Sequence, residues 1–219
     1  GCILAVPVEH DDRWKVACIV CRPPATGDPS KRLTATVRTL ALLDAGGTSN
    51  ISPAVVVVGK TACVVWESNA GDARGIYACS VPLDAAASPG QVVRLSAENS
   101  NSYNPALVAL ADGSLFAAWD SFRDNSCDIY GAAWRDGKWQ GERRLTHDAR
   151  IERHPHLAAW NNEVWMAWQA QSFKGIRINA VGEQRVAVAR VDADGLKAPA
   201  GLAKALWSGR GLLVRPQIA

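Results

Sequence analysis

The sequence predicts an all-β protein built from about four consecutive four-stranded antiparallel blades of a β-propeller. Three observations predict this fold: a repeat of roughly 50 residues, four short apolar segments in each copy, and no sustained helical period. Four antiparallel strands at this period are typical of a propeller blade. A single blade cannot bury both its faces, so we expect neighbouring blades to shelter one another.

The first strand of each copy follows a proline, and the second ends on a large apolar residue. The first-strand segments are residues 52–55, 104–107, 154–157 and 215–218, with a proline-free counterpart at 2–5. The second strands end at Cys21, Trp66, Trp119 and Trp168. We interpret the recurring tryptophan as a wedge between blades, a core role.

The third and fourth strands complete each unit. The third strands are predicted at 32–36, 75–79, 128–132 and 185–189, and fourth strands at 92–95 and 143–146. Asp-Gly dipeptides at 112–113, 136–137 and 194–195 predict hairpin turns.

These landmarks divide one partial propeller domain, residues 1–219, into blades at approximately 1–44, 45–98, 99–148 and 149–210. Residues 211–219 begin another blade. Because both chain ends begin an inner strand, we expect the chain to be part of a six- or seven-bladed ring.

The blade rhythm resembles that of sialidase-like (BNR-type) six-bladed propellers and related repeat proteins of bacterial envelopes. The residues that carry the resemblance are a proline-led strand, a strand ending in Trp119-Asp120, the run 128–130 (Asp-Ile-Tyr) and the turn 137–139 (Gly-Lys-Trp). The resemblance implies an extracytoplasmic protein, periplasmic or secreted. It also implies an arginine that opens an inner strand, for which Arg153 and Arg215 are the matches.

Charge and hydropathy exclude two classes of partner. The formal net charge is +3, from 24 basic and 21 acidic residues that are interspersed, so we predict no nucleic-acid partner. No apolar run approaches the ~18 residues of a membrane span, so no membrane-spanning segment is predicted.

Hairpin geometry gathers polar residues at one end of the ring. The residues before each proline lie beside those that follow each tryptophan, around the mouth of the central channel. The predicted ligand-binding residues are Asn50, Ser52, Glu67, Tyr103, Asn104, Asp120, Arg123, Arg153, His154, Gln169 and Arg215. Such a mouth suits a carbohydrate or a protein ligand.

Catalytic candidates at this mouth are Glu67, Asp120 and Arg153. Two carboxylates on adjacent blades that face one cavity could perform glycosidic acid/base chemistry. The alternative is that Asp120 organises the hairpin end and takes no part in chemistry.

Metal and cofactor sites are not predicted. His154 and His156 share one side of a strand, but a metal site needs three or four ligands and no third is evident. Cys18 and Cys21 have redox or zinc spacing, yet the repeat places Cys21 in the tryptophan position. An insertion at 172–184 lengthens the fourth unit and could carry specificity.

The leading functional prediction is a non-catalytic binding module for a carbohydrate or protein partner, since the catalytic signatures of sialidases are absent. The first alternative is a sialidase-like glycoside hydrolase whose catalytic set is completed by blades outside this chain. The second is a structural repeat of a larger envelope protein.

Overall fold

The computed structural model describes residues 1–22, 36–84, 86–173, 181–198, 207–209 and 216–218. Within these ranges the secondary structure consists of strands, and no helix occurs. The predicted third strand at 32–35, the centre of the insertion (174–180) and Arg215 lie outside the described residues.

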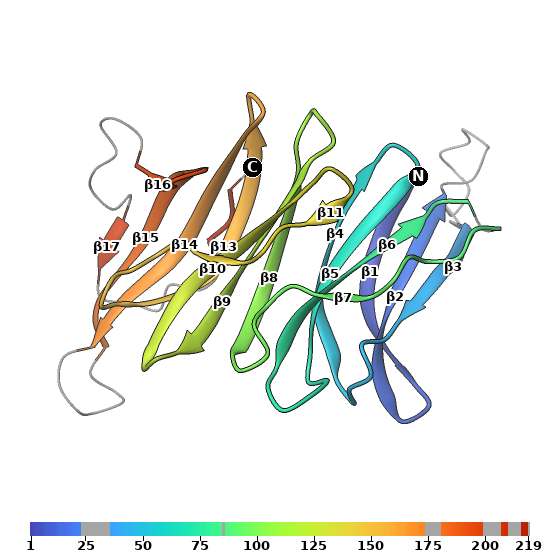
Figure 1. Ribbon diagram of the computed structural model, residues 1–219, viewed down its shortest axis with the longest axis horizontal. Coiled ribbons are helices and arrows are strands. Elements are labelled where there is room, and N and C mark those ends of the chain that lie inside the picture. Colours follow the sequence, from blue (N-terminus) through green and yellow to red (C-terminus); the bar gives the residue numbers. More distant parts are fainter. Residues whose placement is uncertain (23–35, 85, 174–180, 199–206, 210–215, 219) are drawn as a thin grey trace, which may run out of the picture.

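The strands form four antiparallel sheets that follow one another along the chain (Figure 1). The first contains β1 (Cys2–His10), β2 (Arg13–Arg22) and β3 (Thr36–Leu43); the second contains β4 (Asn50–Val58), β5 (Thr61–Ser68), β6 (Gly75–Pro82) and β7 (Val93–Arg94). The third contains β8 (Asn101–Ala109), β9 (Leu115–Arg123), β10 (Ser126–Arg135), β11 (Lys138–Trp139) and β12 (Arg143–Arg144). The fourth contains β13 (Ile151–Trp160), β14 (Glu163–Phe173), β15 (Val181–Asp192), β16 (Gly195–Lys197) and β17 (Trp207–Gly209).

Each sheet has the topology of a propeller blade. Sequential strands pair as antiparallel neighbours, and two short segments share the outermost position in the third and fourth sheets: β11 and β12 both pair with β10, and β16 and β17 both pair with β15. The first strands β1, β4, β8 and β13 contact one another in that order. These are the inner strands, and the all-β propeller fold predicted from the sequence is confirmed.

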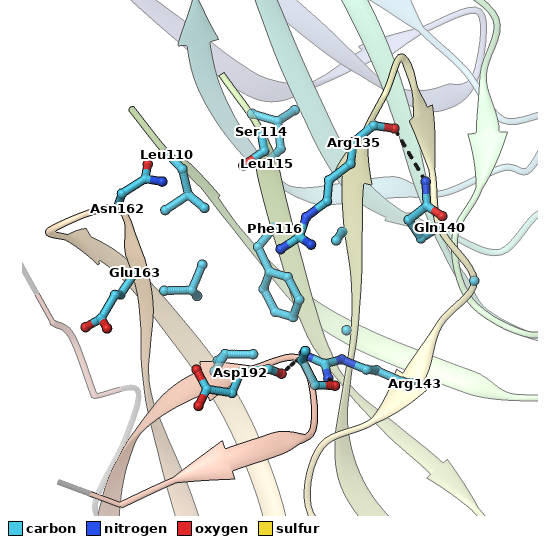
Figure 2. A pocket seen from close by; sticks show the side chains of 16 residues that line it. Leu110, Ser114, Leu115, Phe116, Arg135, Gln140, Arg143, Asn162, Glu163 and Asp192 are labelled. Carbon is cyan, nitrogen blue, oxygen red and sulfur yellow. Dashed lines mark hydrogen bonds between the residues drawn. The ribbon is translucent and has the colours of Figure 1, made fainter. Parts of the chain in front are cut away.

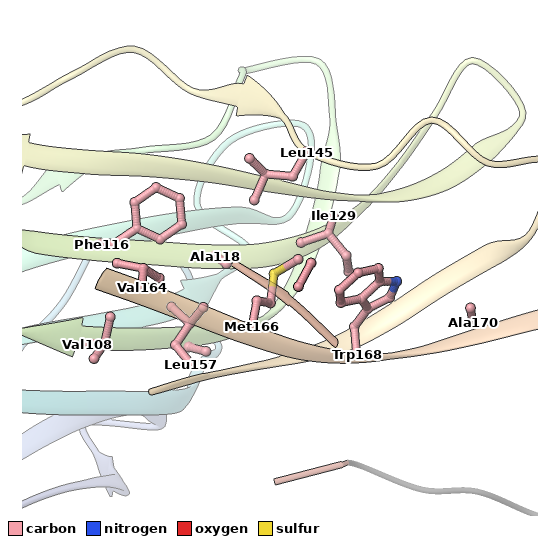
Figure 3. Packing of buried hydrophobic residues seen from close by; sticks show 12 residues of the cluster. Val108, Phe116, Ala118, Ile129, Leu145, Leu157, Val164, Met166, Trp168 and Ala170 are labelled. Carbon is pink, nitrogen blue, oxygen red and sulfur yellow. The ribbon is translucent and has the colours of Figure 1, made fainter. Parts of the chain in front are cut away.

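The hydrophobic core lies between blades, in three clusters that each draw on two adjacent sheets. Trp66 packs with blade 1 residues such as Val16 and Leu43, and Trp119 packs with Val65 and Ile76 of blade 2. In the cluster of Figure 3, Trp168 and Met166 of blade 4 meet Ile129 and Phe116 of blade 3.

The tryptophans therefore act as the predicted wedges against the preceding blade. Trp66 and Trp119 are completely buried. Burying side chains of this size contributes favourable free energy that holds neighbouring blades together.

Candidate functional site

A β-bulge precedes the proline in the inner strands of blades 2, 3 and 4. The register between the first two strands shifts at Ile51/Ala54, Tyr103/Ala106 and Arg153/His156. The bulged residues Ser52, Asn104 and His154 have φ values of 52°, 53° and 52°, a left-handed conformation that is uncommon outside glycine. A bulge interrupts the pairing of the two strands locally and re-aims a side chain.

The bulges line one cavity of about 270 Å³. Its walls are the proline steps of successive repeats, formed by Ser52, Pro53, Asn104, Pro105, His154, Pro155, His156, Pro216 and Gln217. The volume is slightly below the ~300–1,000 Å³ that is usual for small-molecule sites. This cavity is the described part of the channel mouth.

Glu67 and Asp120 hold the bulge of the following blade. Glu67, near the end of β5, accepts a hydrogen bond at Oε2 from the backbone N–H of Asn104 (3.0 Å). Asp120, in the same position of β9, accepts one at Oδ1 from the backbone N–H of His154 (3.0 Å). Each carboxylate therefore clamps two blades together beside the cavity.

Asn104 joins the two clamps into one polar chain. Its side-chain Nδ2 donates to Asp120 Oδ1 (2.9 Å), while its backbone N–H donates to Glu67. The other oxygen of Glu67, Oε1, lies 3.4 Å from Nη1 of Arg74. Both carboxyl groups are thus positioned by the same residue on the cavity wall.

The two carboxyl groups have different surroundings. Asp120 is completely buried, and burial raises its pKa to about 6, although the bonds from His154 and Asn104 and the charge of Arg153 act to lower it. Asp120 Oδ2 accepts no hydrogen bond from the described residues; its nearest cation is Nε of Arg153, 3.6 Å away on a side chain that is 46% exposed. Asp120 is consequently a carboxyl group poised to titrate near neutrality.

Four other predicted site residues lie away from the cavity or beneath it. Asn50 is buried, and its Oδ1 accepts a hydrogen bond from Trp66 Nε1 (2.9 Å), which gives it a structural role. Arg123 pairs with Glu142 (2.7 Å) and stacks over Tyr130 on the outer part of blade 3. Gln169 is buried opposite Arg153, and Tyr103 is half-buried opposite Asp120.

Sequence reasoning missed Glu152 and Arg74. Glu152 is buried and accepts a hydrogen bond from Trp168 Nε1 (3.1 Å), as Asn50 does from Trp66. Both stand two residues before the bulge, so the repeat alignment itself could have identified Glu152 as the partner of a tryptophan. Arg74 lies in a loop, and no repeat signal marks it.

The two histidines make no metal site with the described residues. Nδ1 of His156 accepts a hydrogen bond from the backbone N–H of Ile218 (3.1 Å). No group of three or more His, Cys, Asp or Glu residues in the described ranges could hold a metal ion.

A second cavity of about 370 Å³ separates the opposite ends of blades 3 and 4. Figure 2 shows Phe116 on its wall, flanked by Arg135 and Arg143, with Glu163 and Asp192 facing them. Arg143 donates to the backbone carbonyls of Asp192 and Ala193, and this bond pair ties the two blades together. No helix in the described part of the chain is long and apolar enough to cross a membrane.

No protein-family model and no curated protein matches the chain. Among solved structures, it is similar to an α-L-arabinofuranosidase from Lactobacillus brevis, with 13% identity and a TM-score of 0.51 over 84% of this chain and 64% of that one. An α-L-arabinanase from Penicillium chrysogenum in complex with arabinobiose is 11% identical, with a TM-score of 0.49 over 89% of this chain and 72% of that one. A thermostable family-43 glycoside hydrolase is 12% identical, with a TM-score of 0.47 over 89% of this chain and 74% of that one. At these identities the likeness concerns the fold, and the first structure carries it.

These comparisons correct two sequence-based predictions. The structure that carries the likeness is an arabinofuranosidase and not a sialidase, so the propeller part of the resemblance is supported and its sialidase part is not. The leading prediction of a non-catalytic binding module is contradicted, because the structure that carries the likeness in fold is a hydrolase, an α-L-arabinofuranosidase. The comparisons favour the alternative prediction of a glycoside hydrolase.

Proposed function

We propose that the chain forms part of a glycoside hydrolase whose active site is the channel mouth, with Asp120 as the proton donor. The observation that carries this proposal is the state of the Asp120 carboxyl group. Its pKa is raised to about 6 and its Oδ2 has no hydrogen-bond donor among the described residues. A general acid works best when its pKa lies near the working pH.

Glu67 is the proposed second carboxyl group. Glycoside hydrolysis needs two carboxyl groups that flank the scissile bond, and Asn104 bonds to both Glu67 and Asp120. Glu67 is also paired with Arg74. The pair therefore combines an acid of raised pKa with a carboxyl group held by an arginine.

Arg153 controls access to Asp120 in this proposal. Its half-exposed side chain lies beside Asp120 Oδ2 at the cavity edge, and rotation of this side chain toward a bound sugar would uncover that oxygen. The guanidinium group would then donate to sugar hydroxyls while Oδ2 faces the glycosidic oxygen.

The substrates to examine first are α-L-arabinofuranosides, chosen because an arabinofuranosidase shares the fold. The full-length protein is assayed with aryl α-L-arabinofuranosides, arabino-oligosaccharides, aryl pyranosides and a sialoside. We expect hydrolysis of a furanoside, and we expect Asp120→Asn to slow it by about 100-fold or more.

Asp128→Asn is the matched control, because Asp128 is an equally buried carboxylate of blade 3 that pairs with Arg144 (2.7 Å) and does not line the cavity. This variant should retain activity in proportion to its folded fraction. Full activity in folded Asp120→Asn, or no hydrolysis of any glycoside by the full-length protein, would refute the proposal.

A further inference from the structure

Blade 1 differs from the other blades in the direction of its inner strand. Trp14, beside the β1–β2 turn, forms a parallel bridge with Ser49 just before β4, so the other end of this hairpin, with Cys2 and Cys21, lies away from the channel mouth. The inner strand β1 pairs with β2 in continuous register, from Cys2↔Cys21 to His10↔Arg13, without a bulge. β1 contains Pro7, but no bulge accompanies it. The pair that opens this register consists of two cysteines.

Cys2 and Cys21 face each other directly across the two strands. Directly opposed residues of an antiparallel pair have Cα atoms about 4.5–5.5 Å apart, within the ~4.4–6.8 Å that a disulfide spans. Their side chains share one face of the sheet, and Cys2 is close enough to contribute to the raised pKa of the Cys21 thiol. A disulfide would need no rearrangement of the backbone.

Access also separates this pair from the other cysteines. Cys2 is exposed and Cys21 half-buried, whereas Cys18, Cys63, Cys79 and Cys127 are buried. Burial raises the pKa of Cys63 and of Cys127 to about 12, so these two thiols do not form the reactive thiolate near neutral pH.

We propose that Cys2 and Cys21 form a reversible cross-strand disulfide that fastens the inner strand of blade 1 at the end farthest from the β1–β2 turn. The oxidant is a low-molecular-weight disulfide such as oxidised glutathione. The Cys2 thiolate attacks one glutathione sulfur and releases the first reduced glutathione. The Cys21 thiolate then attacks the Cys2 sulfur of the mixed disulfide and releases the second, so two protein thiols are oxidised and one glutathione disulfide is reduced.

The order of attack follows from exposure. Partial burial, together with the neighbouring Cys2, raises the pKa of the Cys21 thiol, so the exposed Cys2 is the first nucleophile. The product would stabilise β1 against β2 at the end of the sheet that lies away from the channel mouth.

The test uses the full chain equilibrated in glutathione buffers of increasing oxidised fraction, followed by alkylation of free thiols and peptide mass spectrometry. We expect two alkylation sites to disappear together, with Cys2 linked to Cys21, and to return on reduction. Thermal unfolding should occur at a higher temperature in the oxidised form.

Cys21→Ser and Cys2→Ser should each abolish both the linkage and the oxidation-dependent shift in melting temperature. Cys127→Ala, a buried control, should leave both unchanged. The proposal is overturned if the folded wild-type chain keeps both thiols alkylatable in oxidised glutathione. It is equally overturned if the reaction stops at glutathionylated Cys2, or if Cys2 links to another cysteine. None of these results depends on glycoside hydrolysis.

Discussion

The seam between blades 2 and 3 and the seam between blades 3 and 4 use the same clamp with different chemistry. In both, a carboxylate at the end of a second strand accepts the backbone N–H of the next bulge. Glu67 has a second partner in Arg74, which lies 3.4 Å from its free oxygen. Asp120 is one methylene shorter and completely buried, and its Oδ2 lacks a hydrogen-bond donor among the described residues.

This difference teaches that one position in a repeat can serve stability in one blade and reactivity in the next. A satisfied carboxylate stabilises its seam, whereas a buried carboxyl group with a raised pKa costs free energy when it ionises. Such a cost is characteristic of functional sites. The comparison can be broken or sharpened by substitutions at Trp119, Asp120, Glu67, Asn104 and Ser52.

The largest effect should come from the packing that both seams share. Trp119→Ala removes a fully buried wedge between blades 2 and 3 and should lower the free energy of unfolding by about 3–5 kcal/mol. Chemical denaturation measures this loss of stability. Trp160→Ala is the control, because Trp160 is 63% exposed and its substitution should change stability by less than about 1 kcal/mol. Equal losses of stability in the two variants would contradict the role of Trp119 as a wedge.

The next effect separates the two clamps. Asp120→Asn keeps the acceptor for His154 and removes the ionisation cost, so it should stabilise the protein at pH 8 by up to about 3 kcal/mol. Glu67→Gln loses the partly exposed pair with Arg74 and should destabilise by less than about 1 kcal/mol.

The pH dependence of these stabilities follows from the raised pKa. The folded state binds the Asp120 proton more tightly than the unfolded state, so this contribution is complete below pH 3.8 and is lost as the pH rises to about 6. Asp120→Asn should remove that loss between pH 4 and 7. If the stabilities of the wild type and of Asp120→Asn changed with pH in parallel, the two clamps would be alike.

A smaller effect is expected from Asn104, which links the clamps. Asn104→Ala loses the bond to Asp120 Oδ1 and places alanine at a φ of 53°, so unfolding should become easier by about 1–3 kcal/mol. Asn104→Gly loses the same bond without the strain. Equal stabilities of the two variants would argue against strain at this bulge.

The smallest effect concerns a bulge that belongs to neither clamp. Ser52 is exposed and has a φ of 52°, so Ser52→Gly should relieve backbone strain and raise stability by less than about 1 kcal/mol. Differential scanning calorimetry can resolve it, and a clear loss of stability would indicate that the serine side chain makes a stabilising contact.

The propeller fold could be predicted because strand length, apolar runs and the tryptophan position repeat along the chain. Turns were predicted less well: Asp136-Gly137 joins β10 and β11, but Asp11-Asp12, Asp124-Asn125 and Asn161-Asn162 also adopt left-handed hairpin turns. These pairs lack glycine. Asparagine and aspartate also tolerate positive φ, but without a glycine they mark a turn less clearly in the sequence.

The site could be predicted only in outline. The step before each proline placed Ser52, Asn104 and His154 on one cavity, because hairpin geometry alone brings these positions together. The interblade bonds of Glu67 and Asp120 depend on how far each blade is rotated against the next, and the strand pattern does not encode this rotation. The structural bonds of Asn50 and Arg123 depend on side-chain direction for the same reason.

The most direct test is an NMR titration of the Asp120 side-chain carboxyl carbon in the folded protein, assigned by its absence in Asp120→Asn. A carboxyl group poised for proton donation at the mouth should titrate near pH 6, well above its ordinary value. Titration at or below pH 3.8 would mean that Asp120 serves only as a clamp on the next bulge, and the proposed acid would be lost.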